Sequence, residues 1–416
     1  MNEPMNPQRL SELLSSAAND VPMGDDGMTR IGQGISRRRR MHQTLAVGGT
    51  SLAVIAVVLF GFILRPENAS HVVPPPVGQS SLPTTEPSAS PTASPADTHP
   101  LPAGFQARSV SSLGQRWWVL GDTSIEATSD GGSTYETLTL PGGWKPLAGA
   151  GENPSGIAFV DATHGVVWQA GGQWATDDGG SHWSGRVSSA PATMNVIDSV
   201  RVDGVVYLLA SQCATASQQS CTTVLTTYDG IGVTMEDQSV PVAAGEIARS
   251  IAVASETIWI LALDGSGAPG HVLKSTDRGK TFTSTPHSDG CLTGSLTAVS
   301  DADVYEICVS GMAASLRRSS DGGKSFAAIP SKQSISNQAS MLASPGGTGV
   351  LSPGAGLLRT TDGFKTFVDV GAPSPTQSAS LQPGSRSEQM FALESTDTGI
   401  RLWVSLNAGQ TWKSVN

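Results

Sequence analysis

A short motif with an aspartate beside glycines recurs along the chain from residue 128 onward. Two copies read STDRGKTF (275–282) and SSDGGKSF (319–326), and we call this eight-residue motif the octet. An aspartate in such a setting could act as a general acid or base, bind a metal ion, or close a turn. The third position of the octet is occupied, in chain order, by Asp130, Asp178, Asp229, Asp277, Asp321, Asp362 and Asn407.

The spacing of the octets favours the structural role. The seven copies follow one another at intervals of 41 to 51 residues, and a period of about 40–50 residues with glycine-rich turns is typical of β-propeller blades. Seven such residues distributed around a ring would not converge on one substrate. An aspartate side chain accepts hydrogen bonds from backbone N–H groups two or more residues further on, and glycine adopts positive φ without strain. We therefore assign the seven residues to turns and predict no catalytic residue.

The segments between the octets have the pattern of short strands. In residues 155–187, apolar runs at 157–160 and 166–168 are separated by turn-forming residues. Three such runs precede each octet and one follows it. The sequence therefore predicts an all-β fold, a seven-bladed β-propeller of four-stranded antiparallel blades over residues 104–416. Each octet would lie in the hairpin between the third and fourth strands, and its final aromatic residue would pack between blades.

The octet resembles the Asp-box, or BNR, motif S/T-x-D-x-G-x-T-W/F of sialidases, sortilin-type receptors and photosystem II assembly-factor propellers. The resemblance covers residues 104–416 and implies the fold; it says little about activity, because Asp-boxes in that family lie away from the active site. Three copies depart from the motif. The third has Ile231 at a glycine position and ends without an aromatic residue, the sixth has Phe364 where glycine is usual, and the seventh has Asn407. We expect an irregular third blade.

The sialidase activity that the resemblance implies would need three arginines on the substrate carboxylate, a Tyr–Glu nucleophile pair and an aspartic acid/base. The chain has no Arg-Ile-Pro motif, and no sequence feature groups three of its arginines, which include Arg108, Arg116, Arg186, Arg201 and Arg249. Tyr305 is the one candidate tyrosine, since Tyr135 and Tyr228 belong to octets and Tyr207 to an apolar strand. Its neighbour Glu306 should point to the opposite face of the strand.

Other catalytic and metal-binding signatures are missing from the sequence. It contains no H-E-x-x-H, C-x-x-C, G-x-x-x-x-G-K or G-x-S-x-G motif. Four histidines of the C-terminal region are predicted to lie in separate blades, so we expect no metal site and no cofactor; they are His164, His182, His271 and His287. The Trp117-Trp118 pair could line a binding surface, but at least one member should belong to the core of a blade.

All four cysteines lie in the predicted propeller. An even number of cysteines in an oxidising compartment suggests two disulfides, although buried free thiols are the alternative. Three pairings are possible. We favour Cys213–Cys221 and Cys291–Cys308, because each pair falls within one predicted blade.

Residues 44–64 predict a single transmembrane helix. These 21 residues carry no charge and would span about 30 Å as a helix. Residues 37–40 are all arginines and directly precede the segment, which places the N-terminus in the cytoplasm. A cleaved signal peptide is disfavoured, because some 40 residues precede the apolar run and no clear cleavage site follows it.

The remaining segments complete the domain organisation. Residues 1–43 would form a cytoplasmic tail, in which residues 9–18 could form an amphipathic helix for a cytoplasmic partner. Residues 65–103 are rich in Pro, Ser and Thr and are predicted to be an extended linker. The net charge of −10 argues against a nucleic-acid partner.

The sequence thus favours a single-pass, membrane-anchored propeller on the extracytoplasmic side. Its function would be non-catalytic binding of a protein or glycan ligand of the cell envelope. An exo-sialidase-like glycoside hydrolase and an assembly factor for a membrane complex are the alternatives. The Ala/Gly-rich composition and the basic run before the anchor resemble those of actinobacterial membrane proteins.

Overall fold

The computed structural model describes residues 98–145, 155–187, 193–213, 221–287, 290–370, 378–396 and 399–415. The predicted cytoplasmic tail, the predicted transmembrane helix and most of the predicted linker lie outside these residues. Within them, no helix has the length and apolar character needed to cross a membrane.

The described residues form seven four-stranded antiparallel sheets, here called blades one to seven, each made of consecutive strands. Blade one contains β1 (Ser109–Leu113), β2 (Arg116–Leu120), β3 (Ile125–Thr128) and β4 (Glu136–Leu138). Blade two contains β5 (Gly156–Phe159), β6 (Gly165–Gln169), β7 (Gly172–Thr176) and β8 (Ser184–Val187). Blade three contains β9 (Thr193–Val202), β10 (Val205–Cys213), β11 (Cys221–Tyr228) and β12 (Glu236–Ser239). Blade four contains β13 (Ile247–Ala254), β14 (Thr257–Leu263), β15 (His271–Ser275) and β16 (Thr283–Pro286).

The C-terminal three blades follow the same order. Blade five contains β17 (Thr293–Ala298), β18 (Val304–Ser310), β19 (Ala313–Ser319) and β20 (Ala327–Ala328). Blade six contains β21 (Ser340–Ala343), the 3₁₀ turn η1 (Pro345–Gly347), β22 (Gly349–Ser352), β23 (Leu358–Thr360) and β24 (Val368–Asp369). Blade seven contains β25 (Ala379–Pro383), β26 (Met390–Thr396), β27 (Gly399–Ser405) and β28 (Lys413–Ser414).

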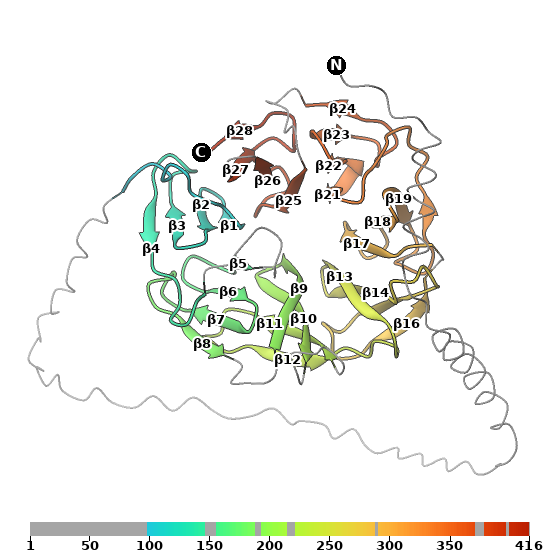
Figure 1. Ribbon diagram of the computed structural model, residues 1–416, viewed down its shortest axis with the longest axis horizontal. Coiled ribbons are helices and arrows are strands. Elements are labelled where there is room, and N and C mark those ends of the chain that lie inside the picture. Colours follow the sequence, from blue (N-terminus) through green and yellow to red (C-terminus); the bar gives the residue numbers. More distant parts are fainter. Residues whose placement is uncertain are drawn as a thin grey trace, which may run out of the picture. The chain divides into compact units, whose positions relative to one another are not determined.

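The blades are arranged in a ring, with the first strand of each blade nearest the centre (Figure 1). The predicted seven-bladed propeller is therefore confirmed, as is the position of the octets between the third and fourth strands. The ring closes between blades seven and one without a shared strand. Instead, Gln382 Oε1 accepts the Val110 N–H at 2.7 Å, and Trp117 packs edge-on against Phe391 at 5.2 Å between ring centroids.

The hydrophobic core is divided into seven clusters, each lying between two neighbouring blades. The aromatic residues that end the octets belong to these clusters, as the sequence predicts: Tyr135, Trp183, Phe282, Phe326, Phe367 and Trp412. Trp117 and Trp118 are both buried, and Trp118 stacks on Phe159 of blade two at 3.8 Å. Neither tryptophan therefore lines a binding surface.

The innermost strands use side chains to satisfy their inner edges. An innermost strand has a sheet partner on one side only, so its other N–H groups need acceptors elsewhere. Ser111 Oγ accepts the Phe159 N–H at 2.8 Å across the gap between blades one and two. Ser340 Oγ accepts the Leu381 N–H at 3.0 Å between blades six and seven. These hydrogen bonds hold the innermost strands of neighbouring blades together around the centre of the ring.

Both favoured disulfides are present. Cys213 and Cys221 are opposite each other on β10 and β11 of blade three. Cys291 precedes β17 and is joined to Cys308 on β18, so this bond lies within blade five.

Part of the segment predicted as a linker, residues 65–103, forms a β-bridge with blade one. His99 and Tyr135 exchange two backbone hydrogen bonds, at 2.8 and 2.7 Å. The His99 ring also lies 2.9 Å from Thr137 Oγ1.

Candidate functional site

The octet aspartates are engaged in their own turns. In the fifth octet, Asp321 Oδ1 accepts hydrogen bonds from Ser319 Oγ at 2.8 Å and from the N–H groups of Lys324 and Ser325 at 3.0 Å each. Asp321 Oδ2 accepts the Ser325 hydroxyl at 2.6 Å. Two contacts recur in the first, second, fourth, sixth and seventh octets. The hydroxyl at position one of the octet donates to the side chain at position three, and the side chain at position seven is hydrogen-bonded to the same position-three side chain.

These bonds favour the ionised carboxylate. The hydroxyl and backbone N–H of Thr281 lower the pKa of Asp277 to about 2, and the same groups of Thr366 lower the pKa of Asp362 to about 2. A carboxylate that is ionised at neutral pH and already accepts several hydrogen bonds is a poor general acid. The geometry is that of a turn.

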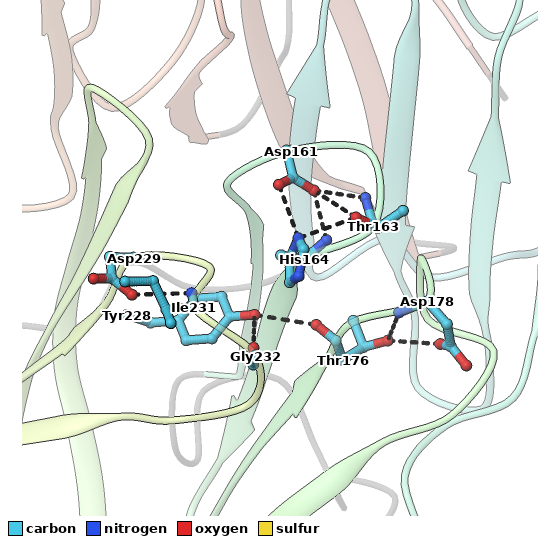
Figure 2. A network of polar contacts seen from close by, with 9 residues as sticks. All are labelled: Asp161, Thr163, His164, Thr176, Asp178, Tyr228, Asp229, Ile231 and Gly232. Carbon is cyan, nitrogen blue, oxygen red and sulfur yellow. Dashed lines mark hydrogen bonds and ion pairs between the residues drawn. The ribbon is translucent and has the colours of Figure 1, made fainter. Parts of the chain in front are cut away.

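The third octet departs from this geometry, but the irregular third blade that its sequence predicted keeps four antiparallel strands like the other blades. Asp229 Oδ1 accepts the Ile231 N–H at 3.0 Å, and the hydrogen bond between first and third residues found in the other octets is not among its contacts. The hairpin is instead tied to blade two, because the Tyr228 hydroxyl lies 3.1 Å from the Thr176 carbonyl oxygen and 3.0 Å from that of Gly232 (Figure 2).

A candidate binding site is a central funnel of about 700 Å³. It opens where the innermost strands β1, β5, β21 and β25 begin. The octets begin where the third strands end, and the third strand of an antiparallel meander runs parallel to the first. The octets therefore lie at the opposite end of the ring from the funnel. A deeper cavity of about 240 Å³ adjoins the funnel and shares Ser109, Asp198 and Gln382 with it.

The funnel is lined mainly by uncharged polar side chains. Its hydroxyl and amide groups come from Ser109, Ser155, Ser199, Asn337, Gln338, Ser340, Ser378, Ser380, Gln382 and Ser395. Apolar surface is supplied by Trp168, Leu393 and Ile400, among others. Sequence reasoning missed these residues, because single serines and amides at strand starts carry no motif.

Among the described residues, two charged side chains line the funnel, and both have partners. The Arg108 guanidinium donates from Nε to Asp122 Oδ1 at 2.7 Å and from Nη2 to Asp122 Oδ2 at 3.1 Å. Asp198 Oδ2 accepts the Ser250 hydroxyl at 2.7 Å and the Ile251 N–H at 2.9 Å. Asp198 is half-buried, and burial raises the pKa of its carboxyl group. Asp198 therefore joins blades three and four.

The residues that a sialidase would need are not brought together. Tyr305 lies in a groove of about 360 Å³ between blades five and six, with Asp303 and Arg318, and not in the funnel. Burial raises the pKa of Tyr305. Glu306 points to the opposite face of β18, as predicted, where its Oε1 lies 2.9 Å from His287 Nε2.

The arginines named from the sequence are likewise dispersed. Arg116 lies over the Trp118 ring at 5.0 Å, and Arg201 donates to the Phe159 carbonyl oxygen at 2.9 Å in the deeper cavity. Burial lowers the pKa of Arg201. Among the side chains that the structure describes, Arg108 and Arg201 are the arginines that line the two central cavities.

The predicted distribution of histidines is wrong in one respect. His164 and His182 lie in the same blade, blade two, because the turn after β5 and the second octet belong to one sheet. Each is paired with a nearby aspartate, His164 with Asp161 at 2.8 Å and His182 with Asp178 at 2.6 Å.

His287 has a different environment that sequence spacing did not reveal. Pairing of β17 with β18 sets Gly294 opposite Cys308, and this register brings His287, Cys291 and Glu306 together.

Comparison with known proteins gives similarity to solved structures only. No family model and no curated protein matches the chain. A structure of YCF48 bound to D1 peptide has 14% identity and a TM-score of 0.40, covering 62% of this chain and 80% of that one. The Hadza microbial sialidase Hz136 has 10% identity and a TM-score of 0.46, covering 70% and 76%.

A puromycin-hydrolyzing peptidase of Mycobacterium tuberculosis has 13% identity and a TM-score of 0.49, covering 76% of this chain and 55% of that one. At such identities the likeness concerns the fold and not the activity. The described residues form a seven-bladed β-propeller, and this conclusion rests on the sheet topology.

Proposed function

We propose that the protein is a non-catalytic binding module whose central funnel takes a glycan of the cell envelope. The observation that carries this proposal is the lining of the funnel, which combines many hydroxyl and amide groups with little charge. Sugar hydroxyls both donate and accept hydrogen bonds, and serine hydroxyls and amides do the same. Ile400, which is half-buried at the funnel, supplies apolar surface for the C–H faces of sugar rings.

The size and charge of the funnel agree with this ligand class. Its volume of about 700 Å³ falls in the range of known ligand pockets, about 300–1,000 Å³. A strongly charged ligand would lack a free partner among the described lining residues, because Arg108 is paired with Asp122 and Asp198 is held by blade four.

The same lining disfavours hydrolysis. Most glycoside hydrolases use two carboxyl groups on either side of the scissile bond. Among the described residues that line the two cavities, Asp198 is the one with a carboxyl group. An exo-sialidase-like activity is therefore the alternative, and the experiment below includes it.

The test is glycan binding by the full-length protein in detergent, using cell-wall glycan fragments on an array and then calorimetry. Asn337 and Gln338 are exposed at the funnel, so the double variant Asn337→Ala/Gln338→Ala should weaken binding about tenfold through the loss of hydrogen bonds. Gln410→Ala is the matched control, because Gln410 is exposed in the seventh octet at the opposite end of the ring.

Equal binding by the double variant and the wild type would show that the funnel is not the site. Release of fluorophore from a fluorogenic sialoside or another glycoside would show that the protein is a glycoside hydrolase and would overturn the proposal of a non-catalytic module. Capture of an envelope protein without any glycan binding would favour a protein ligand.

We also propose that residues 44–64 anchor the protein in the membrane and that residues 65–103 hold the propeller on the extracytoplasmic side. The two disulfides support this placement, since disulfides persist in oxidising compartments. Protease added to intact spheroplasts should digest the linker and release the propeller. Release only after lysis would contradict the proposed orientation.

A further inference from the structure

A buried cluster of potential metal ligands lies between blades four and five. His287 Nε2 is 2.9 Å from Glu306 Oε1, and Cys291 Sγ is 3.7 Å from the same oxygen. One ligand atom from each of these residues lies within 4.8 Å of the others. Cys308 belongs to the same cluster through its bond to Cys291. All four residues are almost completely inaccessible to solvent.

The cluster contains polar atoms without hydrogen-bond partners. His287 Nδ1 and Glu306 Oε2 are buried and have no hydrogen bond within the described part of the chain. Buried polar groups in proteins are almost always hydrogen-bonded or bound to a metal. Cys291 and Cys308 belong to the same hydrophobic core as Leu296 and Val304.

We propose that the reduced form of the protein binds one Zn²⁺ through His287, Cys291, Cys308 and Glu306, and that formation of the Cys291–Cys308 disulfide releases the ion. One imidazole nitrogen, two thiolates and one carboxylate form a four-coordinate set of the ligand types that zinc prefers. In the described structure both sulfurs are committed to the disulfide, which leaves two of the four ligands.

The exchange of zinc for the disulfide balances with an organic disulfide as oxidant. One zinc-bound thiolate attacks the oxidant, forming a mixed disulfide and expelling one thiolate. The second cysteine thiolate attacks the mixed disulfide, forms the Cys291–Cys308 bond and expels the second thiolate. The oxidant gains the two electrons that the cysteines lose, the expelled thiolates take up two protons, and Zn²⁺ leaves. The reverse sequence needs a dithiol reductant.

The other cysteine pair provides an internal control. Cys213 and Cys221 join neighbouring strands of blade three, and Cys221 is exposed. Among the described residues, the potential metal-ligand cluster includes neither of them. Reduced Cys213 and Cys221 should therefore add no tight zinc site.

The experiment uses full-length protein purified in detergent, reduced with a dithiol that is then removed, and kept without oxygen. We expect one tightly bound zinc per chain in the reduced protein and none in the oxidised protein, measured by mass spectrometry of the metal. Zinc should also protect Cys291 and Cys308, but not Cys213 and Cys221, from alkylation. Co²⁺ in place of zinc should show thiolate charge-transfer bands and the visible bands of a tetrahedral site.

Variants assign the ligands. Cys213→Ser/Cys221→Ser should keep the zinc, whereas His287→Asn and Glu306→Gln should each weaken its binding at least about tenfold. If those variants fail to fold, the wild-type protein still decides the matter, because diamide should release one zinc per chain as the disulfide forms. Equal zinc in the reduced and oxidised proteins, or unprotected Cys291 and Cys308, would overturn the proposal.

Discussion

At the level of single residues, the third position of the octet shows how a carboxylate can recur without catalysing anything. Each regular copy accepts hydrogen bonds from hydroxyl and N–H groups no more than four residues away. Asn407 does the same, with Oδ1 accepting the Thr411 N–H at 2.9 Å while Nδ2 donates to the Thr411 hydroxyl. The turn therefore needs an oxygen acceptor at this position, and the negative charge is dispensable.

The octets should make the propeller sensitive to acid. The pKa values of Asp277 and Asp362 are about 2 in the folded protein, below their ordinary value of 3.8. A lowered pKa means that the carboxylates contribute stability above about pH 4 and that this contribution is lost as the pH falls towards 2. The urea concentration at the midpoint of unfolding should therefore fall as the pH is lowered from about 4 to 2.

The double variant Asp277→Asn/Asp362→Asn should show a smaller loss of stability between pH 5 and 2 than the wild type. The exposed Asp177, which precedes an octet aspartate, provides the control variant Asp177→Asn. Parallel pH profiles for the wild type and the double variant would refute the assignment.

A second residue-level case is Phe364, which has φ of 67° where most octets have glycine. Its ring is buried against Tyr305 at 5.2 Å and Phe367 at 6.2 Å. Replacing a buried Phe by a small residue costs about 3–5 kcal/mol, and relief of the left-handed backbone returns about 1 kcal/mol.

We therefore expect Phe364→Gly to lower the free energy of unfolding by about 2–4 kcal/mol. Ala408→Gly changes the fourth position of the seventh octet, one residue before the position that Phe364 occupies in its own octet, where φ is 54° but the side chain is small. This substitution should be neutral or stabilising. The free energy of unfolding of both variants is measured by urea titration. A stabilised Phe364→Gly variant would mean that backbone strain outweighs packing.

At the level of elements, the inner edges of the blades depend on single hydroxyl groups. Ser111→Ala would leave the buried N–H of Phe159 without its acceptor, at a cost of about 1–3 kcal/mol. The Phe159 amide should also exchange with deuterium faster. Ser320→Ala removes an exposed serine hydroxyl from the fifth octet and should change neither quantity. Unchanged exchange at Phe159 would show that another group can replace the hydroxyl.

At the level of the whole molecule, the ring is closed by packing and side-chain hydrogen bonds between its two ends. Phe391→Ala would remove the ring that packs on Trp117, at a cost of about 3–5 kcal/mol. Because each blade shares a hydrophobic cluster with both neighbours, we expect hydrogen-exchange protection to fall in all blades together. Loss confined to blades one and seven would indicate independent unfolding, as in an open repeat array.

The features that depend on local contacts could be predicted from the amino-acid sequence. The number of blades follows from seven octets, and each turn is closed by hydrogen bonds within eight residues. The alternation of apolar residues predicted the strands, because successive side chains in a strand point to opposite faces. The same rule predicted that the side chains of Tyr305 and Glu306 point to opposite faces of their strand. The cysteine pairs were favoured because each falls within one blade, and blades are contiguous in the chain.

The residues that meet at the centre and between blades could not be predicted in this way, because they come from distant parts of the chain. Gln382 meets Val110 across a separation of 272 residues, and the funnel combines single serines and amides from five blades. His287, Cys291 and Glu306 come together through strand register and burial, neither of which leaves a spacing motif. Such sites depend on how the ring closes, and that is determined by packing among all seven blades and by no single segment.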